Sequence, residues 1–195
     1  MDDFLITDRE LARQLDTSEN VRESREKLLI QSQGDEIGVS LFVDEDVITS
    51  LDPTDPTIGL TIQNIEEFCL ALEGVSHFLY LAWNAHHQRS VTLLELELQA
   101  EVDKYITLVD LLQQEGDMEA LRRLRNWLFE KVSFDPNLSE EQLTRYRDAN
   151  HYAGKYCMNL ESLCLNGCAD EELLRQLRRF YRLTQGEKIH LIRSS

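Results

Sequence analysis

A chain of 195 residues has the length of a single domain. Its hydrophobic content of 42% can supply a sizeable core, and a charged content of 29% with only 8 Gly and 3 Pro argues against disorder. The net charge of −16 is uneven: residues 1–70 hold 17 acids and 5 bases, 71–117 hold 8 and 2, and 118–195 hold 11 and 13. The first three-fifths therefore repels nucleic acid and anionic lipid, and a basic partner protein would complement it.

The first 43 residues favour two short helices and a strand. Thr7 and Glu10 form a capping-box pattern that predicts a short helix. Ser18 is a candidate cap for a second helix, which we expect to continue to about Gln31. Residues 37–43 alternate and are rich in Val, Ile and Phe, which favours a strand.

A turn-rich run follows the first predicted elements. Asp44 can cap a short helix over residues 45–51, and residues 52–56 contain two prolines and two aspartates. We therefore expect an acidic N-terminal region, 1–56, packed on a helical body, 57–195, with the whole forming one domain.

The middle of the chain predicts two long helices. Residues 64–87 are mostly apolar, which predicts a helix buried nearly all round. Gly74 lies inside it at a cost of about 1 kcal/mol relative to alanine, and such a glycine often lets another backbone approach. Residues 94–98 alternate like a strand, but the longer window to Gln114 repeats at helical spacing and favours a helix.

The last third predicts three more helices. Asp117 caps the first, a Ser-x-x-Gln capping box opens a long one over 139–166, and a strongly amphipathic one covers 170–185. Residues 188–192 are expected to form a short strand or an ordered tail. The predicted fold is mainly α: a bundle of about five to seven helices, with one or two short strands near residues 37–43.

One polar line runs along the helix predicted for residues 64–87. Glu66, Glu73, His77 and Asn84 fall within roughly 20° of a common line at about 100° per residue. A buried helix would carry these groups into the core, where ionisable side chains need partners. The line is either a functional site or a polar network that fixes helix register.

Three residues on two neighbouring helices form a candidate metal site. Glu73 and His77 are one turn apart, and Glu101 lies on the next helix, which a short link joins to the first. Two carboxylates and an imidazole can bind one divalent metal ion or act as an acid–base pair. The Glu-x-x-His pairs of di-iron bundles are absent, so the spacing also fits a structural network.

Two further rows of side chains share a helix face. Cys157, Cys164 and Cys168 lack the close Cys-x-x-Cys spacing of zinc sites, so we interpret them as small buried residues. A row of arginines on the last predicted helix could bind phosphate or an acidic peptide, or could form a solvated face. Its members are Arg175, Arg178, Arg179 and Arg182.

The sequence lacks the usual catalytic signatures, including phosphate-cradling Gly-rich loops and the Gly-x-Ser-x-Gly elbow. We therefore expect a non-enzymatic adaptor or regulatory subunit that binds another protein and needs no cofactor, with self-association as a further expectation. The alternative is a metal-binding protein or metal-dependent enzyme with one divalent ion. Neither a signal peptide nor a spanning apolar run is visible, so we expect a cytoplasmic protein without membrane or nucleic-acid partners.

Overall fold

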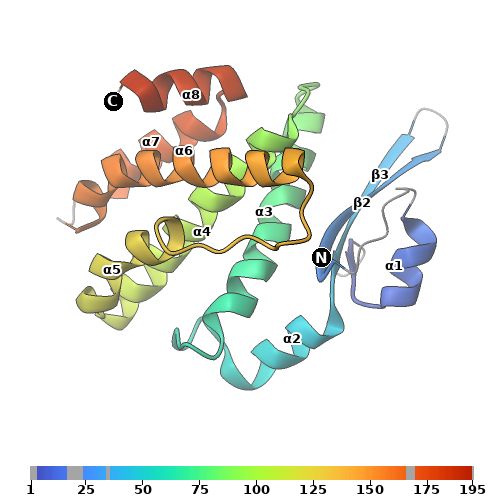
Figure 1. Cartoon of the computed structure of the whole chain (residues 1–195), viewed down its shortest axis with the longest axis horizontal. Coiled ribbons are helices and arrows are strands. Elements are labelled where there is room, and N and C mark those ends of the chain that lie inside the picture. The colour runs from blue at the N-terminus through green and yellow to red at the C-terminus, as the bar shows by residue number, and fades with distance from the viewer. Residues whose placement is uncertain (1–3, 17–23, 34–35, 166–169, 195) are drawn as a thin grey trace. The chain divides into compact units, whose positions relative to one another are not determined.

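The computed structural model describes residues 4–16, 24–33, 36–165 and 170–194, and Figure 1 shows their helices and strands. They form eight α-helices and one three-stranded sheet, so the mainly α fold is confirmed with slightly more helices than expected. The chain divides into two compact units, residues 1–88 and 89–195. The helix predicted at 64–87 thus belongs with the N-terminal sheet, whereas the sequence suggested a boundary near residue 56.

The first unit is a small sheet with helices on its two faces. Strand β3 is central, parallel to β1 and antiparallel to β2. Phe42 of β3 packs with Ala12 of α1, whereas Leu41 and Val43 pack with Leu70 and other residues of α3, because successive strand residues point to opposite faces. The elements are β1 Leu5–Ile6, α1 Arg9–Leu15, β2 Glu26–Gln33, β3 Glu36–Val43, α2 Glu45–Leu51, a 3-10 turn Asp52–Thr54 and α3 Ile65–His86.

Most predictions for the first unit are confirmed, but the second helix is wrong. Residues 26–31 belong to β2, because pairing with β3 and burial of Leu29 outweigh a weak helical pattern. Ser18 lies outside the described residues. The first helix is capped by Asp8, whose Oδ1 accepts a hydrogen bond from the Leu11 amide at 2.8 Å, rather than by Thr7.

The second unit is helical throughout its described part. Helix α4 packs along α6 and α5, and α6 also contacts α7 and α8. Leu98 and Leu108 of α4 and Leu160 of α6 are fully buried in this core. Residues 94–98 are helical, as the longer window predicted. The elements are α4 Leu93–Glu115, α5 Met118–Phe129, α6 Glu140–Leu165, α7 Asp170–Tyr181 and α8 Gln185–Ser194.

The C-terminal segment differs from its prediction. Residues 188–192 lie in α8, not in a strand or tail, and α7 ends at Tyr181 rather than near residue 185. The cause is a capping box: Glu187 Oε2 accepts hydrogen bonds from the amide and the hydroxyl of Thr184, each at 2.8 Å. Among the described residues, no helix combines the length and apolarity needed to cross a bilayer.

Candidate functional site

The polar line of α3 divides into parts with different surroundings. His77 and Asn84 are buried and Glu73 is half-buried, but Glu66 is exposed, which differs from the predicted burial of the whole line. Glu66 lies in the first turn, where a solvated carboxylate interacts favourably with the helix dipole. Asn84 Nδ2 donates to the carbonyl of Tyr80 at 2.8 Å, so its side chain is bonded within its own helix.

A residue that the sequence did not single out lies beside His77. Glu26, at the start of β2, places Oε1 3.7 Å from His77 Nδ1, and each of the two side chains is about 11% exposed. Gly74 makes this approach possible, because a Cβ there would lie 2.6 Å from Glu26 Cγ and 2.8 Å from Leu41 Cδ1. The expected close approach at Gly74 is therefore made by side chains rather than by another backbone. Since residue 26 fell in a predicted helix, no sequence signal connected it to α3.

The charged residues of α4 bond within the second unit. Glu101 Oε1 accepts a hydrogen bond from Lys104 Nζ at 2.7 Å, and Glu97 Oε1 lies 3.4 Å from Arg145 Nε. Glu101 is thus engaged by a cation on its own helix. The predicted metal site of Glu73, His77 and Glu101 draws on both units and stays a prediction.

Of the three cysteines in the predicted row, only the side chain of Cys157 belongs to the part of the chain that the structure describes. Cys157 is fully buried in α6, as expected of a small apolar residue. The side chain of Cys164 and the whole of Cys168 lie outside the described residues.

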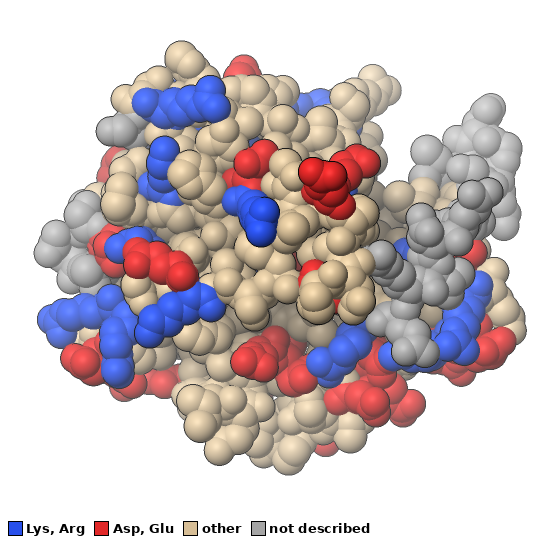
Figure 2. Space-filling model, viewed as in Figure 1, with Lys and Arg blue, Asp and Glu red and all other residues tan. Residues whose placement is uncertain are grey.

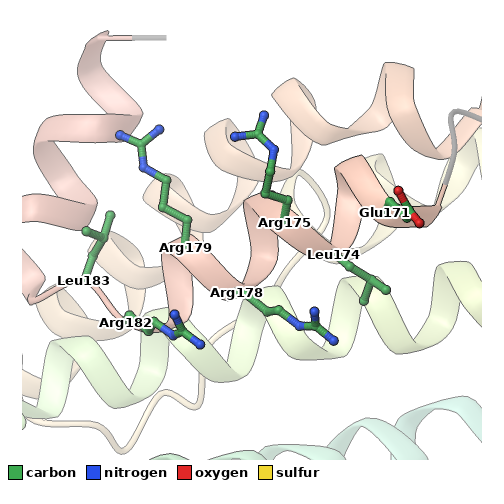
Figure 3. Close-up of a pocket in the computed structure, with 7 residues that line it drawn as sticks. All are labelled: Glu171, Leu174, Arg175, Arg178, Arg179, Arg182 and Leu183. Atoms are coloured by element: carbon green, nitrogen blue, oxygen red, sulfur yellow. The ribbon is translucent and has the colours of Figure 1, made fainter.

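Three residues of the predicted arginine row lie on α7 and Arg182 directly follows it, and Figure 3 shows how their side chains leave the ribbon. Arg175 and Arg179 project to one side of the ribbon, and Arg178 and Arg182 project to the other. Both pairs have the i, i+4 spacing that aligns side chains on a helix. The four arginines line an open cavity of about 760 Å³, which we call the arginine groove, together with Glu171, Leu174 and Leu183.

The arginines of the groove differ in their electrostatic surroundings. Arg175 donates to both carboxylate oxygens of Glu172, at 2.8 and 2.6 Å. Hydrogen bonds from Arg175 and Gln176 lower the pKa of Glu172 to about 2, so this acid stays ionised and offsets Arg175. Arg178, Arg179 and Arg182 are exposed, and in the described part of the chain no acidic side chain forms an ion pair with them.

The arginines of α5 show the opposite arrangement. Arg123 Nε lies 3.8 Å from Glu119, and Arg125 lies 3.2 Å from Glu130 and 3.3 Å from Glu161. Figure 2 shows basic and acidic side chains next to one another over α5. Two of the three arginines of α5 thus have acidic partners nearby, which differs from Arg178, Arg179 and Arg182.

A buried lysine that the sequence analysis missed fixes the inner side of α7. Lys188 of α8 is fully buried; its Nζ donates to Gln99 Oε1 at 2.7 Å and lies 4.8 Å from the centroid of the Phe180 ring. Burial lowers the pKa of Lys188 to about 7, although the charges of Glu95 and Asp103 oppose this shift. Because Phe180 belongs to α7, these contacts hold the arginine face of that helix outward.

Comparisons of the chain with protein-family models, with curated proteins and with solved structures give no match.

Proposed function

We propose that the protein is a non-enzymatic adaptor or regulatory subunit that binds an acidic segment of a partner protein in the arginine groove. The observation that carries the proposal is the set of exposed, locally unbalanced guanidinium groups of Arg178, Arg179 and Arg182 beside exposed apolar surface. Guanidinium groups bind carboxylates through paired, charge-assisted hydrogen bonds, which are among the stronger polar contacts in water.

The apolar residues of the groove suggest which acidic segment fits. Leu174, which is 44% exposed, lies at one end and the partly exposed Leu183 lies at the other. The two leucines are nine positions apart, seven of them to the end of α7 at Tyr181, which at about 1.5 Å per residue places them roughly 13 Å apart. An extended peptide covers that length in about four residues, at about 3.3 Å each. A run of glutamates between two leucines four positions apart would match both the charge and the length.

The charge of the whole chain favours a short acidic segment over nucleic acid. The net charge of −16 produces a repulsive field for a long polyanion. A short peptide senses mainly the groups within one Debye length, about 8 Å at physiological salt, which in the groove are four arginines with Glu171 and the Glu172 that pairs with Arg175.

Fluorescence anisotropy with a labelled Glu-Leu-Glu-Glu-Glu-Leu-Glu peptide tests the proposal. The variant Arg178→Gln with Arg182→Gln is compared with Arg122→Gln plus Arg123→Gln, which removes the same charge from the exposed side of α5. We expect the α7 variant to bind the peptide roughly tenfold more weakly, equal to about 1.4 kcal/mol, and the α5 variant to stay within about twofold of the wild type.

Three outcomes would contradict the proposal. Equal weakening in both variants would mean that net charge alone attracts the peptide. Tighter binding of a single-stranded oligonucleotide of equal charge would favour a nucleic-acid site. A dimer that dissociates in the α7 variant but not in the α5 variant would make a second copy of this chain the occupant of the groove.

A further inference from the structure

The loop over residues 55–64, which we call the isoleucine loop, joins the 3-10 turn after α2 to the start of α3 (Figure 1). Among the described residues it carries the two most exposed large hydrophobic side chains. Ile58 is 82% exposed and Ile62 is 90% exposed, whereas the other exposed side chains of this class lie between 36% and 58%. Single exposed apolar residues are common on protein surfaces, but two such residues four positions apart on one loop form a candidate contact surface.

A buried asparagine fixes the conformation of the isoleucine loop. Asn64 is 1% exposed, and its Nδ2 donates to the carbonyls of Thr54 and Gly59, each at 2.9 Å. Its Oδ1 accepts a hydrogen bond from the Thr61 amide at 2.8 Å. One side chain thus bonds the beginning, the middle and the end of the loop to one another. Because the loop is ordered before any partner arrives, a complex would lose little further entropy in ordering it.

The first half of the isoleucine loop has hydrogen bonds of its own. Asp55 Oδ1 accepts from the amide and the hydroxyl of Thr57, at 2.8 and 2.7 Å, and these bonds hold the pKa of Asp55 below its usual value. The Asp55 carbonyl accepts from the amides of Ile58 and Gly59, at 3.1 and 3.3 Å. Ile58 is therefore held toward solvent on a fixed turn, next to a carboxylate that is ionised at neutral pH.

The charge around the isoleucine loop is negative. The chain contains no Lys or Arg from residue 28 to residue 88. Asp55 and Glu66 are exposed near the two ends of the loop, and in the described part of the chain neither forms an ion pair, whereas Glu67 pairs with Arg25 at 2.5 Å. This surface would attract lysine and arginine side chains, and it would repel anionic lipid and nucleic acid.

We infer that the isoleucine loop is a docking surface for a basic amphipathic helix of a partner protein. Such a helix has an apolar face bordered by lysines and arginines. Its apolar face would cover Ile58 and Ile62, and its cations would pair with Asp55 and Glu66. The surface belongs to the first unit and has the opposite charge from the arginine groove. It would therefore give an adaptor a second docking site that does not depend on the proposed binding of an acidic segment by α7.

Fluorescence anisotropy with a labelled Leu-Lys-Lys-Leu-Leu-Lys-Leu-Leu-Lys-Lys-Leu-Leu-Lys-Leu peptide tests this inference, because its leucines form one face of a helix. The variant Ile58→Thr with Ile62→Thr is compared with Leu11→Gln plus Ile30→Thr, which removes two exposed apolar side chains from α1 and β2 of the same unit. We expect the loop variant to bind roughly tenfold more weakly, equal to about 1.4 kcal/mol, and the control to stay within about twofold of the wild type.

Four outcomes would overturn the inference. A wild type without saturable binding would leave the loop without this ligand, and equal binding by the wild type and both variants would mean that net charge alone attracts the peptide. Co-sedimentation with neutral phosphatidylcholine vesicles that only the loop variant loses would make a lipid surface the occupant. A dimer in sedimentation velocity that only the loop variant loses would make a second copy of this chain the occupant. Circular dichroism checks that each variant is folded, and none of these results would alter peptide binding by α7.

Discussion

The two units have similar lengths but very different charges. Residues 1–88 hold 18 acidic and 5 basic side chains, whereas residues 89–195 hold 18 acidic and 15 basic ones. Nearly all of the net negative charge thus belongs to the sheet-containing unit. The arginine groove lies in the nearly neutral unit, where a local excess of positive charge is not cancelled by an acidic background. The net charge of the whole chain is therefore a poor guide to what α7 can bind.

The units also differ in how they accommodate buried charge. In the second unit, buried acids and bases meet groups of the same unit, as Glu97 meets Arg145 and Lys188 meets Gln99. In the first unit, Glu26 of β2 lies beside His77 of α3, with Oε1 3.7 Å from Nδ1. The partners in the second unit lie on different helices, whereas the pair in the first unit joins a strand to a helix. The following variants test this contrast.

The largest expected effect is that of Lys188→Ala. The substitution removes a fully buried side chain and its hydrogen bond to Gln99, which should lower the free energy of unfolding by about 3 kcal/mol. Urea denaturation followed by circular dichroism measures the change. Lys155→Ala, at an exposed position of α6, should change stability by less than about 0.5 kcal/mol. Equal effects of the two variants would mean that the buried contacts of Lys188 contribute nothing.

Gly74→Ala should destabilise the first unit by about 1–2 kcal/mol, although alanine is the better helix former. The new Cβ would lie 2.6 Å from Glu26 Cγ, so the Glu26 side chain has to move. Gly186→Ala is the matched control, because nothing lies within 4 Å of its Cβ position in α8. Thermal melts should show a lower melting temperature for Gly74→Ala and an unchanged or higher melting temperature for Gly186→Ala. A stabilising Gly74→Ala would contradict the close approach of Glu26.

Thr184→Ala should cost about 1 kcal/mol by removing the hydroxyl of the capping box that opens α8. The hydroxyl donates to Glu187 at 2.8 Å, and bonds from Thr184 hold the pKa of Glu187 below its usual value. Thr184→Ser keeps the hydroxyl and should retain most of the stability. If serine were as destabilising as alanine in chemical denaturation, the cap would not be the cause.

The smallest expected effect is a rise in stability with pH. The pKa of Lys188 falls from 10.5 in the unfolded chain to about 7 in the fold. Between these values the unfolded chain binds the proton that the folded chain has released, so the free energy of unfolding should increase with pH, by about 1 kcal/mol from pH 7 to 8. Lys188→Met removes the group, and its denaturation curves should lack this contribution. If the free energy of unfolding depended on pH identically in the wild type and in Lys188→Met, the lowered pKa of Lys188 would be contradicted.

The sequence predicted the helices and strands better than the contacts between side chains that are distant in the chain. Periodicity and caps are local, so the helices at 45–51, 64–87 and 139–166 could be recognised from their own residues. The partner of a buried polar group is not local: Glu95 Oε2 accepts from the Gln185 amide 90 residues away. Glu26 was missed in the same way, because its position beside His77 depends on strand pairing.

The same difference between local signals and contacts of distant residues applies to the candidate sites. Helical spacing alone grouped the four arginines, because three lie on α7 and Arg182 directly follows its last residue. It could not show that Glu172 engages Arg175, or that Arg178, Arg179 and Arg182 are exposed. The α8 capping box is a different case, since Thr184 and Glu187 were visible in the sequence and were not used.

Hydrogen–deuterium exchange of the full chain, with and without a saturating amount of the acidic peptide, is the most direct test of the proposed function. Binding in the arginine groove should slow exchange in the peptides that cover residues 170–183 and leave α5 unchanged. Protection confined to the first unit, or no protection on α7 at saturation, would contradict the assignment of the groove as the docking site.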